Sequence, residues 1–294
     1  MGQIVDVIEG QTFARAEEVG CPICGRFRES RKIRVRYGMI AMVAECPDCR
    51  IAYQTPRPSV EASLAYMNWR WRSSDPYVAN PERQLKRGRK QVAHIRKFLG
   101  RSNTNKPIRL VDFGAGAGSF VRAAVDQGWH ATGIEQSDSA ITRAKEYYGV
   151  ELSKEFKRER YDVATMWDVV EHLRDIEGTL RMIGEHLAED GLLFIETGNF
   201  ENWRRLAEKD NWSLYLFDHQ FYFTPSSLRQ VLHTAGYGDF CLLRVSRAWP
   251  NPKGLIQQPF HTVLSWVEWA KAKARWPAHG DINVMVAVAR KNAA

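Results

Sequence analysis

The stretch from Ile108 to Gly118, IRLVDFGAGAG, constrains the fold of this 294-residue chain more than any other. A short apolar run with β-branched residues is followed at once by an acid and by glycines at 114, 116 and 118. That is the pattern of a buried parallel strand entering a tight turn, and residues 119–125 continue as a helix. Because glycine has no Cβ, the backbone can bend sharply and approach a ligand closely. The pattern predicts a strand, turn and helix that hold a nucleotide-like ligand beside the helix N-terminus.

A second strand strengthens this prediction. This strand is predicted from Trp129 to Ile134. It ends at Glu135, about 20 residues after the glycine turn, where α/β nucleotide sites place an acid for the ribose hydroxyls. The turn itself reads GxGxG, one residue shorter than the dinucleotide pattern GxGxxG, and Asp112 precedes it.

In these features the chain resembles the class I S-adenosylmethionine-dependent methyltransferases, whose first motif has the form of VDFGAGAG and whose second strand ends in an acid. The resemblance continues in YDVATMWDVVEHL (161–173), GLLFIETGN (191–199) and HQFYFTPSSLRQVLHTAGY (219–237), and covers about residues 106–294. It implies S-adenosylmethionine as methyl donor and S-adenosylhomocysteine as product. The residues expected at the cofactor are Asp112, Gly114, Ala115, Gly116, Glu135, Gln136, Trp167 and Asp168.

From Ile108 onward the pattern alternates strand and helix, which predicts an α/β fold with a doubly wound, Rossmann-like and mainly parallel sheet of about seven strands. Strands are expected near 108–113, 130–135, 161–166, 191–197, 238–246 and 283–290, with a short one near Val150. Helices are expected near 118–127, 138–147, 177–189 and 225–235. Ligands in such sheets bind outside the carboxyl ends of the strands.

The chain divides into three predicted parts: a zinc ribbon (1–58), a helical lid or linker (59–105) and the methyltransferase domain (106–294), with insertions near 200–222 and 249–281. Two helices are expected before the glycine turn, near 60–69 and 81–99, the second with Asn80 as N-cap and Pro81 at its first position. The resemblance makes Tyr66 and Tyr77 candidate lid contacts. The second insertion carries three tryptophans and could cover a pocket, pair subunits or touch a membrane interface.

Four cysteines form two CxxC pairs, Cys21 with Cys24 and Cys46 with Cys49, with 21 residues between the pairs. This arrangement is typical of a tetrahedral zinc site and is close to the zinc-ribbon pattern. Disulfides fit less well in a chain expected to be cytosolic. A closed site of four cysteines has no open coordination position, so we expect a structural zinc ion. Cys241, in an apolar strand pattern, is expected in the core.

Candidate catalytic residues follow the fourth and fifth predicted strands. Asp168, Glu171 and His172 lie within five positions at the ligand-bearing end, and His172 could deprotonate a nucleophile. Alternatively, Glu171 and His172 cap the turn and orient Asp168. His219 is a second candidate base, and Tyr222 is a weaker third because its hydroxyl would need a strongly lowered pKa. No Asn/Asp-Pro-Pro-Tyr/Phe turn follows the fourth strand, which argues against methylation of exocyclic amino groups of bases.

The segment around His219 is rich in aromatic residues, which describes a small-molecule pocket better than a duplex groove. Single-stranded nucleic acid also stacks on aromatic rings beside basic residues, so both classes stay open. The rings belong to Trp203, Trp212, Tyr215, Phe217, Phe221, Tyr222 and Phe223.

The resemblance implies two function hypotheses, and the charge and hydropathy of the chain are compatible with both. The formal net charge of +8 favours an anionic partner or marks an inert basic surface, and a basic helix at 81–99 could bind phosphate. No signal-like N-terminus and no apolar run near ~18 residues is present, so we expect a cytoplasmic protein. The first hypothesis is methylation of a small molecule, such as a sugar or natural product. The second is methylation of a ribosomal RNA base through the zinc ribbon and basic helix. The oligomeric state stays open.

Overall fold

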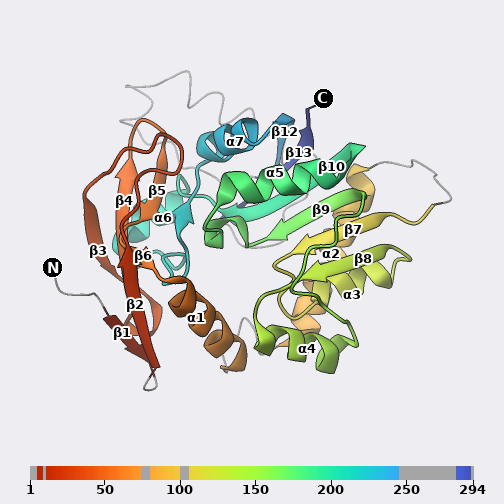
Figure 1. The fold of residues 1–294 in the computed structure, drawn as a ribbon, viewed down its shortest axis with the longest axis horizontal. Coiled ribbons are helices and arrows are strands. Elements are labelled where there is room, and N and C mark those ends of the chain that lie inside the picture. The colour runs from red at the N-terminus through yellow and green to blue at the C-terminus, as the bar shows by residue number, and fades with distance from the viewer. Residues whose placement is uncertain (1–4, 9–10, 74–79, 100–105, 245–282, 293–294) are drawn as a thin grey trace.

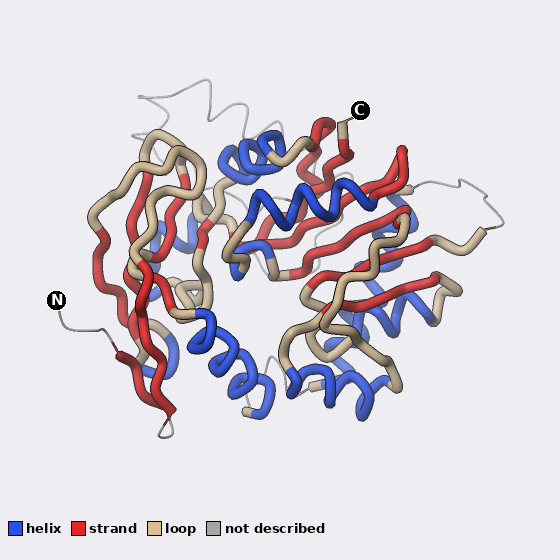
Figure 2. Tube along the Cα trace, viewed as in Figure 1, coloured by secondary structure: helices blue, strands red, loops and turns tan. Residues whose placement is uncertain are grey.

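The computed structural model describes residues 5–8, 11–73, 80–99, 106–244 and 283–292. The predicted insertion at 249–281 and Tyr77 lie outside these residues. Figure 1 shows the main sheet with its helices on one side of the molecule and the N-terminal strands on the other, while helix α1 (Val60–Arg72) lies between the N-terminal strands and α4. Figure 2 shows the same division by secondary structure.

The main sheet has six strands in the order β12-β13-β10-β9-β7-β8. β8, β7, β9 and β10 run parallel to one another, and β13 lies antiparallel between β10 and β12. The doubly wound, mainly parallel fold is thus confirmed. The strands are β7 (Arg109–Phe113), β8 (His130–Ile134), β9 (Tyr161–Trp167), β10 (Leu187–Gly198), β12 (Tyr237–Arg244) and β13 (Val284–Lys291).

The expected seventh strand near Val150 was wrong. Gly149, at φ 62°, ends helix α4 (Asp138–Tyr148), and the Val150 amide donates to the Ala144 carbonyl at 3.2 Å as part of that cap. The segment then makes an isolated bridge from Ser153 to Ile134. Because Val150 belongs to the cap of the helix, too few residues remain here for a strand.

Helices cover both faces of the main sheet, as the alternation along its strands requires. Leu110 and Phe194 face α2 (Pro81–Phe98) and α3 (Ser119–Val125), whereas their neighbours in the chain face the opposite side. That opposite side packs against α5 (Ile176–His186) and α7 (Pro225–Thr234). Asn80 caps α2 as predicted, with its side chain accepting from the Arg83 amide at 2.9 Å.

The N-terminal part forms two small sheets. One joins β1 (Val5–Ile8), β2 (Gln11–Glu17) and β6 (Arg57–Pro58). The other has the order β11-β5-β4-β3, with the short helix η1 (Arg36–Gly38) between β3 and β4. Its strands are β3 (Ser30–Arg34), β4 (Ile40–Cys46), β5 (Ile51–Gln54) and β11 (Phe221–Tyr222).

Strand β11 comes from the segment predicted as an insertion near 200–222. Its two residues pair antiparallel with β5, Phe221 opposite Tyr53 and Tyr222 opposite Ala52. The rest of that segment contains α6 (Trp203–Glu208) and η3 (Lys209–Asn211), and the short helix η2 (Val170–His172) follows β9. The sheet of β3, β4, β5 and β11, called the cysteine-bearing sheet because β4 ends at Cys46, therefore includes the two residues that follow His219 and Gln220. Among the described residues, no helix combines the length and apolar character needed to cross a membrane.

Candidate active site

The glycine turn lies after β7 and has the backbone conformation that its sequence predicts. Gly114, Gly116 and Gly118 have φ angles of 65°, 53° and 76°. A Cβ on Gly114 would come within 2.5 Å of a methyl group of Val169, and one on Gly116 within 2.7 Å of the Trp71 ring. A side chain at either position would therefore collide with Val169 or Trp71, which pack directly on the turn.

Glu135, directly after β8, is tied to the glycine turn. One carboxylate oxygen accepts from the Gly116 amide at 2.8 Å, and the other accepts from the Gln136 and Ser137 amides at 2.8 and 2.9 Å. Burial raises the pKa of Glu135, although these backbone donors oppose the rise. Ala115 closes the same corner, with its amide donating to the Ile134 carbonyl at 2.9 Å.

Helix α1 contacts the glycine turn and the residues after Glu135 through side chains that were not predicted from the sequence. The Asn68 side-chain oxygen accepts from the Ser137 hydroxyl at 2.9 Å, and Trp71 lies against Gly116. Asn68 and Trp71 are three residues apart and share one helix face, a spacing that could have identified them. The predicted lid residue Tyr66 is instead buried, its ring 5.3 Å from that of Phe217.

Three other predicted cofactor residues lie around the strand ends. The buried carboxyl of Asp112 accepts from the Thr165 hydroxyl at 2.6 Å, and burial raises its pKa to about 8. Gln136 donates from its side chain to the Lys154 carbonyl at 2.8 Å. Trp167 packs edge-on against Phe120 at 5.3 Å between ring centroids, and its buried indole nitrogen has no hydrogen-bond partner among the described residues.

Asp168 follows β9 in a left-handed conformation, at φ 58°. Its carboxylate pairs with Arg87 of α2 at 2.8 Å, and Arg87 also pairs with Glu196 of β10. The sequence predicted a solvated or phosphate-binding role for this basic helix. Arg87 instead joins α2 to the carboxyl ends of β9 and β10.

Two histidines that are distant in the sequence meet beside these strand ends. The rings of His172 and His219 are perpendicular, with centroids 4.7 Å apart. His172 Nδ1 lies 3.0 Å from the Asp218 carbonyl and 3.4 Å from its carboxylate, and Thr197 donates to Glu171 at 2.9 Å. One ligating atom each from Glu171, His172 and His219 lie within 4.8 Å of one another, so the cluster could hold a divalent cation or transfer a proton.

The protonation of this cluster follows from burial and mutual charge. Burial, and then the charge of Asp168, raise the pKa of Glu171 well above its ordinary value. Burial, and then His172, lower the pKa of His219 to about 3, so His219 is neutral near pH 7. Burial opposes ionisation of Asp218, but the charges of His172 and then Arg70 outweigh burial and lower the pKa of Asp218.

A closely packed pocket adjoins the cluster and leaves no space for a water molecule in this structure. It lies between the end of β10 and the aromatic segment, which brings the predicted residue Tyr222 next to His219. The lining residues are Glu171, Thr197, Gly198, Trp212, Leu214, His219, Phe221 and Tyr222.

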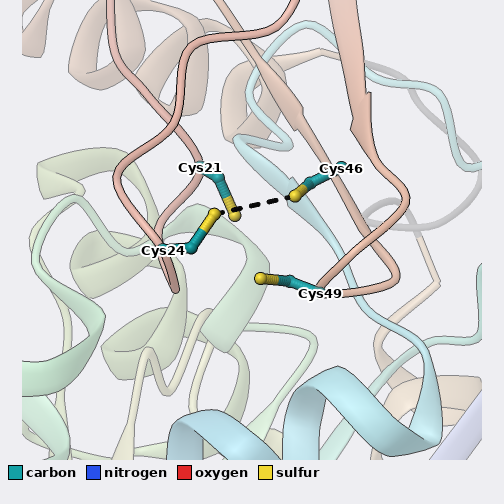
Figure 3. Close-up of side chains that lie close together, drawn as sticks. All are labelled: Cys21, Cys24, Cys46 and Cys49. Carbon is teal, nitrogen blue, oxygen red and sulfur yellow. Dashed lines mark hydrogen bonds between the residues drawn. The ribbon is translucent and has the colours of Figure 1, made fainter.

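The four cysteines of the CxxC pairs converge as their spacing predicts (Figure 3). All four are free, and one ligating sulfur from each lies within 4.8 Å of the others, with Cys24 and Cys46 sulfurs 3.8 Å apart. Burial raises the pKa of the Cys46 thiol, but hydrogen bonds from Cys49 and its neighbours outweigh it and lower the pKa to about 7. This donor set fits a zinc ion. Cys241 is partly buried beside the α2 face of the sheet.

Comparison with known proteins gives consistent matches. A family model described as a methyltransferase domain matches residues 83–241, more than half of the chain. A ubiquinone biosynthesis O-methyltransferase of Rhodopseudomonas palustris strain HaA2 is 27% identical over 149 residues, which cover 45% of this chain and 58% of that protein. Another, of Bradyrhizobium sp. strain ORS 278, is 29% identical over 34% of this chain and 43% of its own length. The chain thus spans about half the length of these relatives.

Two solved structures are also similar. The plantazolicin methyltransferase BpumL in complex with S-adenosylhomocysteine has 17% identity and a TM-score of 0.49, over 79% of this chain and 96% of that one. The mitomycin 7-O-methyltransferase MmcR has the same identity and TM-score, over 76% and 60%. Since the family model matches more than half of its residues, the chain belongs to the methyltransferase-domain family.

Proposed function

We propose that the protein methylates a hydroxyl oxygen of a small molecule that carries a ring. The observation behind this proposal is the pairing of His172 with Asp218 beside a small aromatic pocket at the carboxyl ends of β9 and β10. The curated relatives are named O-methyltransferases, which supports oxygen as the accepting atom. Aromatic rings beside a few polar groups are the usual lining of a site for a small planar acceptor.

The cofactor would be held by the residues around the glycine turn. When bound, S-adenosylmethionine supplies a methyl group that a nucleophile takes in an in-line displacement. Gly114 and Gly116 have no Cβ, so the backbone of the turn can approach the cofactor closely, and Glu135 offers its carboxylate to the ribose hydroxyls. Asn68 and Trp71 would cover this end of the cofactor, because α1 already packs there.

His172 is the better candidate base of the two histidines. Asp218 fixes its Nδ1 side, which leaves Nε2 to accept a proton from the acceptor hydroxyl, the arrangement of an oriented acid–base pair. His219 has a pKa near 3, which makes it a poor proton acceptor. We assign His219 and Tyr222 to orienting the acceptor. Orientation supplies much of the rate in such reactions.

For the cysteines, we propose one structural zinc ion held by Cys21, Cys24, Cys46 and Cys49. Four thiolates leave no open coordination position, so the metal would stabilise the β3–β5 sheet and take no part in methyl transfer. Among the residues of the site that the structure describes, none favours RNA over a small molecule.

The experiment is methyl transfer from tritiated S-adenosylmethionine to three small acceptors, namely a catechol, a monophenol and a sugar, and separately to a purified ribosomal RNA. We expect label in a hydroxylated ring compound, and a loss of about 10²–10⁴-fold in turnover for His172→Gln. His130→Gln is the matched control, because His130 is exposed at the opposite end of the sheet. Label only in RNA, with turnover that falls steeply with salt, would refute the proposal.

A further inference from the structure

The segment that carries His219 is fixed by a side chain from the cysteine-bearing sheet. Gln54, at the end of β5, is completely buried. Its side-chain nitrogen donates to the carbonyls of Leu216, Phe217 and His219 at 2.9, 3.1 and 2.5 Å. An amide has two hydrogens, so the three contacts include a shared one.

The buried carbonyls need these donors because of how the chain runs there. Residues 212–220 connect η3 to β11 without helix or strand, so no ladder supplies partners for their backbone groups. Leaving a buried carbonyl without a partner is costly, and an apolar residue at position 54 would do so. A glutamine in this fully buried position is therefore explained by the loop that it holds.

The same loop is tied to the catalytic cluster on its other side. The Gln220 amide donates to the Glu171 carbonyl at 2.8 Å, and its side chain donates to the His172 carbonyl at 2.9 Å. The Gln54 amide donates to the Gln220 carbonyl at 2.9 Å. Continuous hydrogen bonds thus run from β5 through residues 216–220 to both Glu171 and His172.

We propose that Gln54 is a positioning residue of the acceptor site, through which the cysteine-bearing sheet sets the place of His219 against Glu171 and His172. The proposal rests on the proposed function in treating this pocket as the acceptor site. It gives the cysteine-bearing sheet a role in the reaction that requires no contact between its cysteines and the acceptor.

The test is Gln54→Met, which keeps an unbranched side chain of similar size and removes the donor. Tyr53→Phe is the matched control. Tyr53 lies on the same strand, is equally buried and also donates to a carbonyl, that of Arg26 at 3.2 Å, away from the loop. If Gln54→Met does not fold, Gln54→Asn replaces it, because its amide is one methylene too short to reach the loop.

Two readouts on the purified full chain decide the matter. By hydrogen exchange and mass spectrometry, amides of 216–222 should exchange about tenfold faster in Gln54→Met, the order expected for one lost buried hydrogen bond. By NMR titration, the pKa of His219 should rise toward its ordinary 6.5 as the loop gains solvent. Tyr53→Phe should change neither the exchange rate of residues 216–222 nor the pKa of His219. In both variants the affinity for S-adenosylhomocysteine should stay within about threefold of the native value, a smaller change than the loss of a hydrogen bond to the cofactor would cause.

Exchange at 216–222 that is no faster than in Tyr53→Phe, or that rises equally over the whole chain, would overturn the proposal. So would an unchanged His219 titration. Since neither readout needs an acceptor, these outcomes are independent of whether the proposed oxygen methylation is correct.

Discussion

Replacing Glu135 by glutamine tests the cofactor site with the least change in shape. The carboxylate accepts three backbone hydrogen bonds, one on the oxygen near Gly116 and two on the other. A glutamine amide keeps one oxygen, so its nitrogen must face a backbone N–H wherever it is placed. The substitution therefore removes the negative charge and places an amide nitrogen, itself a donor, against a backbone N–H donor.

The expected loss of affinity follows from the hydrogen bonds to ribose. Bonds to a charged partner contribute about 1.5–3 kcal/mol, more than neutral ones. Losing one such contribution weakens the binding of S-adenosylhomocysteine about tenfold to about 150-fold. The same change should lower the free energy of unfolding by about 1–3 kcal/mol, because a backbone donor is left without an acceptor.

Isothermal calorimetry with S-adenosylhomocysteine measures this directly, at a temperature where both proteins are folded. Glu151→Gln is the control, since Glu151 is exposed in the loop beside the same strand end. If the dissociation constant of Glu135→Gln lies within about threefold of the native value, the loss of binding free energy is smaller than the contribution of one charged hydrogen bond. That result would refute the ribose assignment.

Three further predictions concern metal and pH. Cys46→Ser should abolish stoichiometric zinc in the purified protein, as measured by elemental analysis, because one of four thiolates is lost; native protein without zinc would refute the site. His219 is held neutral, with a pKa near 3 against an ordinary 6.5, so its contribution to stability is present above pH 6.5 and lost as pH falls from there toward 3. Melting temperatures of His219→Gln should accordingly decline less between pH 6.5 and 4.5 than those of the native protein, and parallel declines would contradict this. The raised pKa of Asp112, about 8, has the opposite sign: its ionisation destabilises the fold as pH rises from about 4 to about 8. Asp112→Asn, whose oxygen can still accept from Thr165, should gain stability relative to native protein as pH rises to 8, and a pH-independent difference would contradict this.

Local patterns predicted the main elements because each carries its own signal. The strand before the glycine turn, the acid after the next strand and the N-cap at Asn80 all depend on neighbours within a few residues. The two CxxC pairs also converge as their spacing required. The error at Val150 arose because an apolar residue in a helix cap resembles one that starts a strand.

Contacts between distant segments could not be predicted from local sequence patterns. Strand β11 has only two residues, too few to show a period, so its pairing with β5 depends on tertiary structure. Arg87 lies among several basic residues of α2 that look alike in sequence, and only the packed fold places it against Asp168. Gln54 likewise gains its meaning from a loop more than 160 residues away.

The most direct measurement of the central claim is where the tritiated methyl group goes. Purified protein would be incubated with labelled S-adenosylmethionine and, separately, with a small-molecule extract or total RNA, and label would be counted in the organic-soluble and acid-precipitable fractions. We predict label in the organic-soluble fraction of the small-molecule reaction, lost in His172→Gln and kept in His130→Gln. Label confined to precipitated RNA, or equal labelling by His172→Gln, would contradict the account.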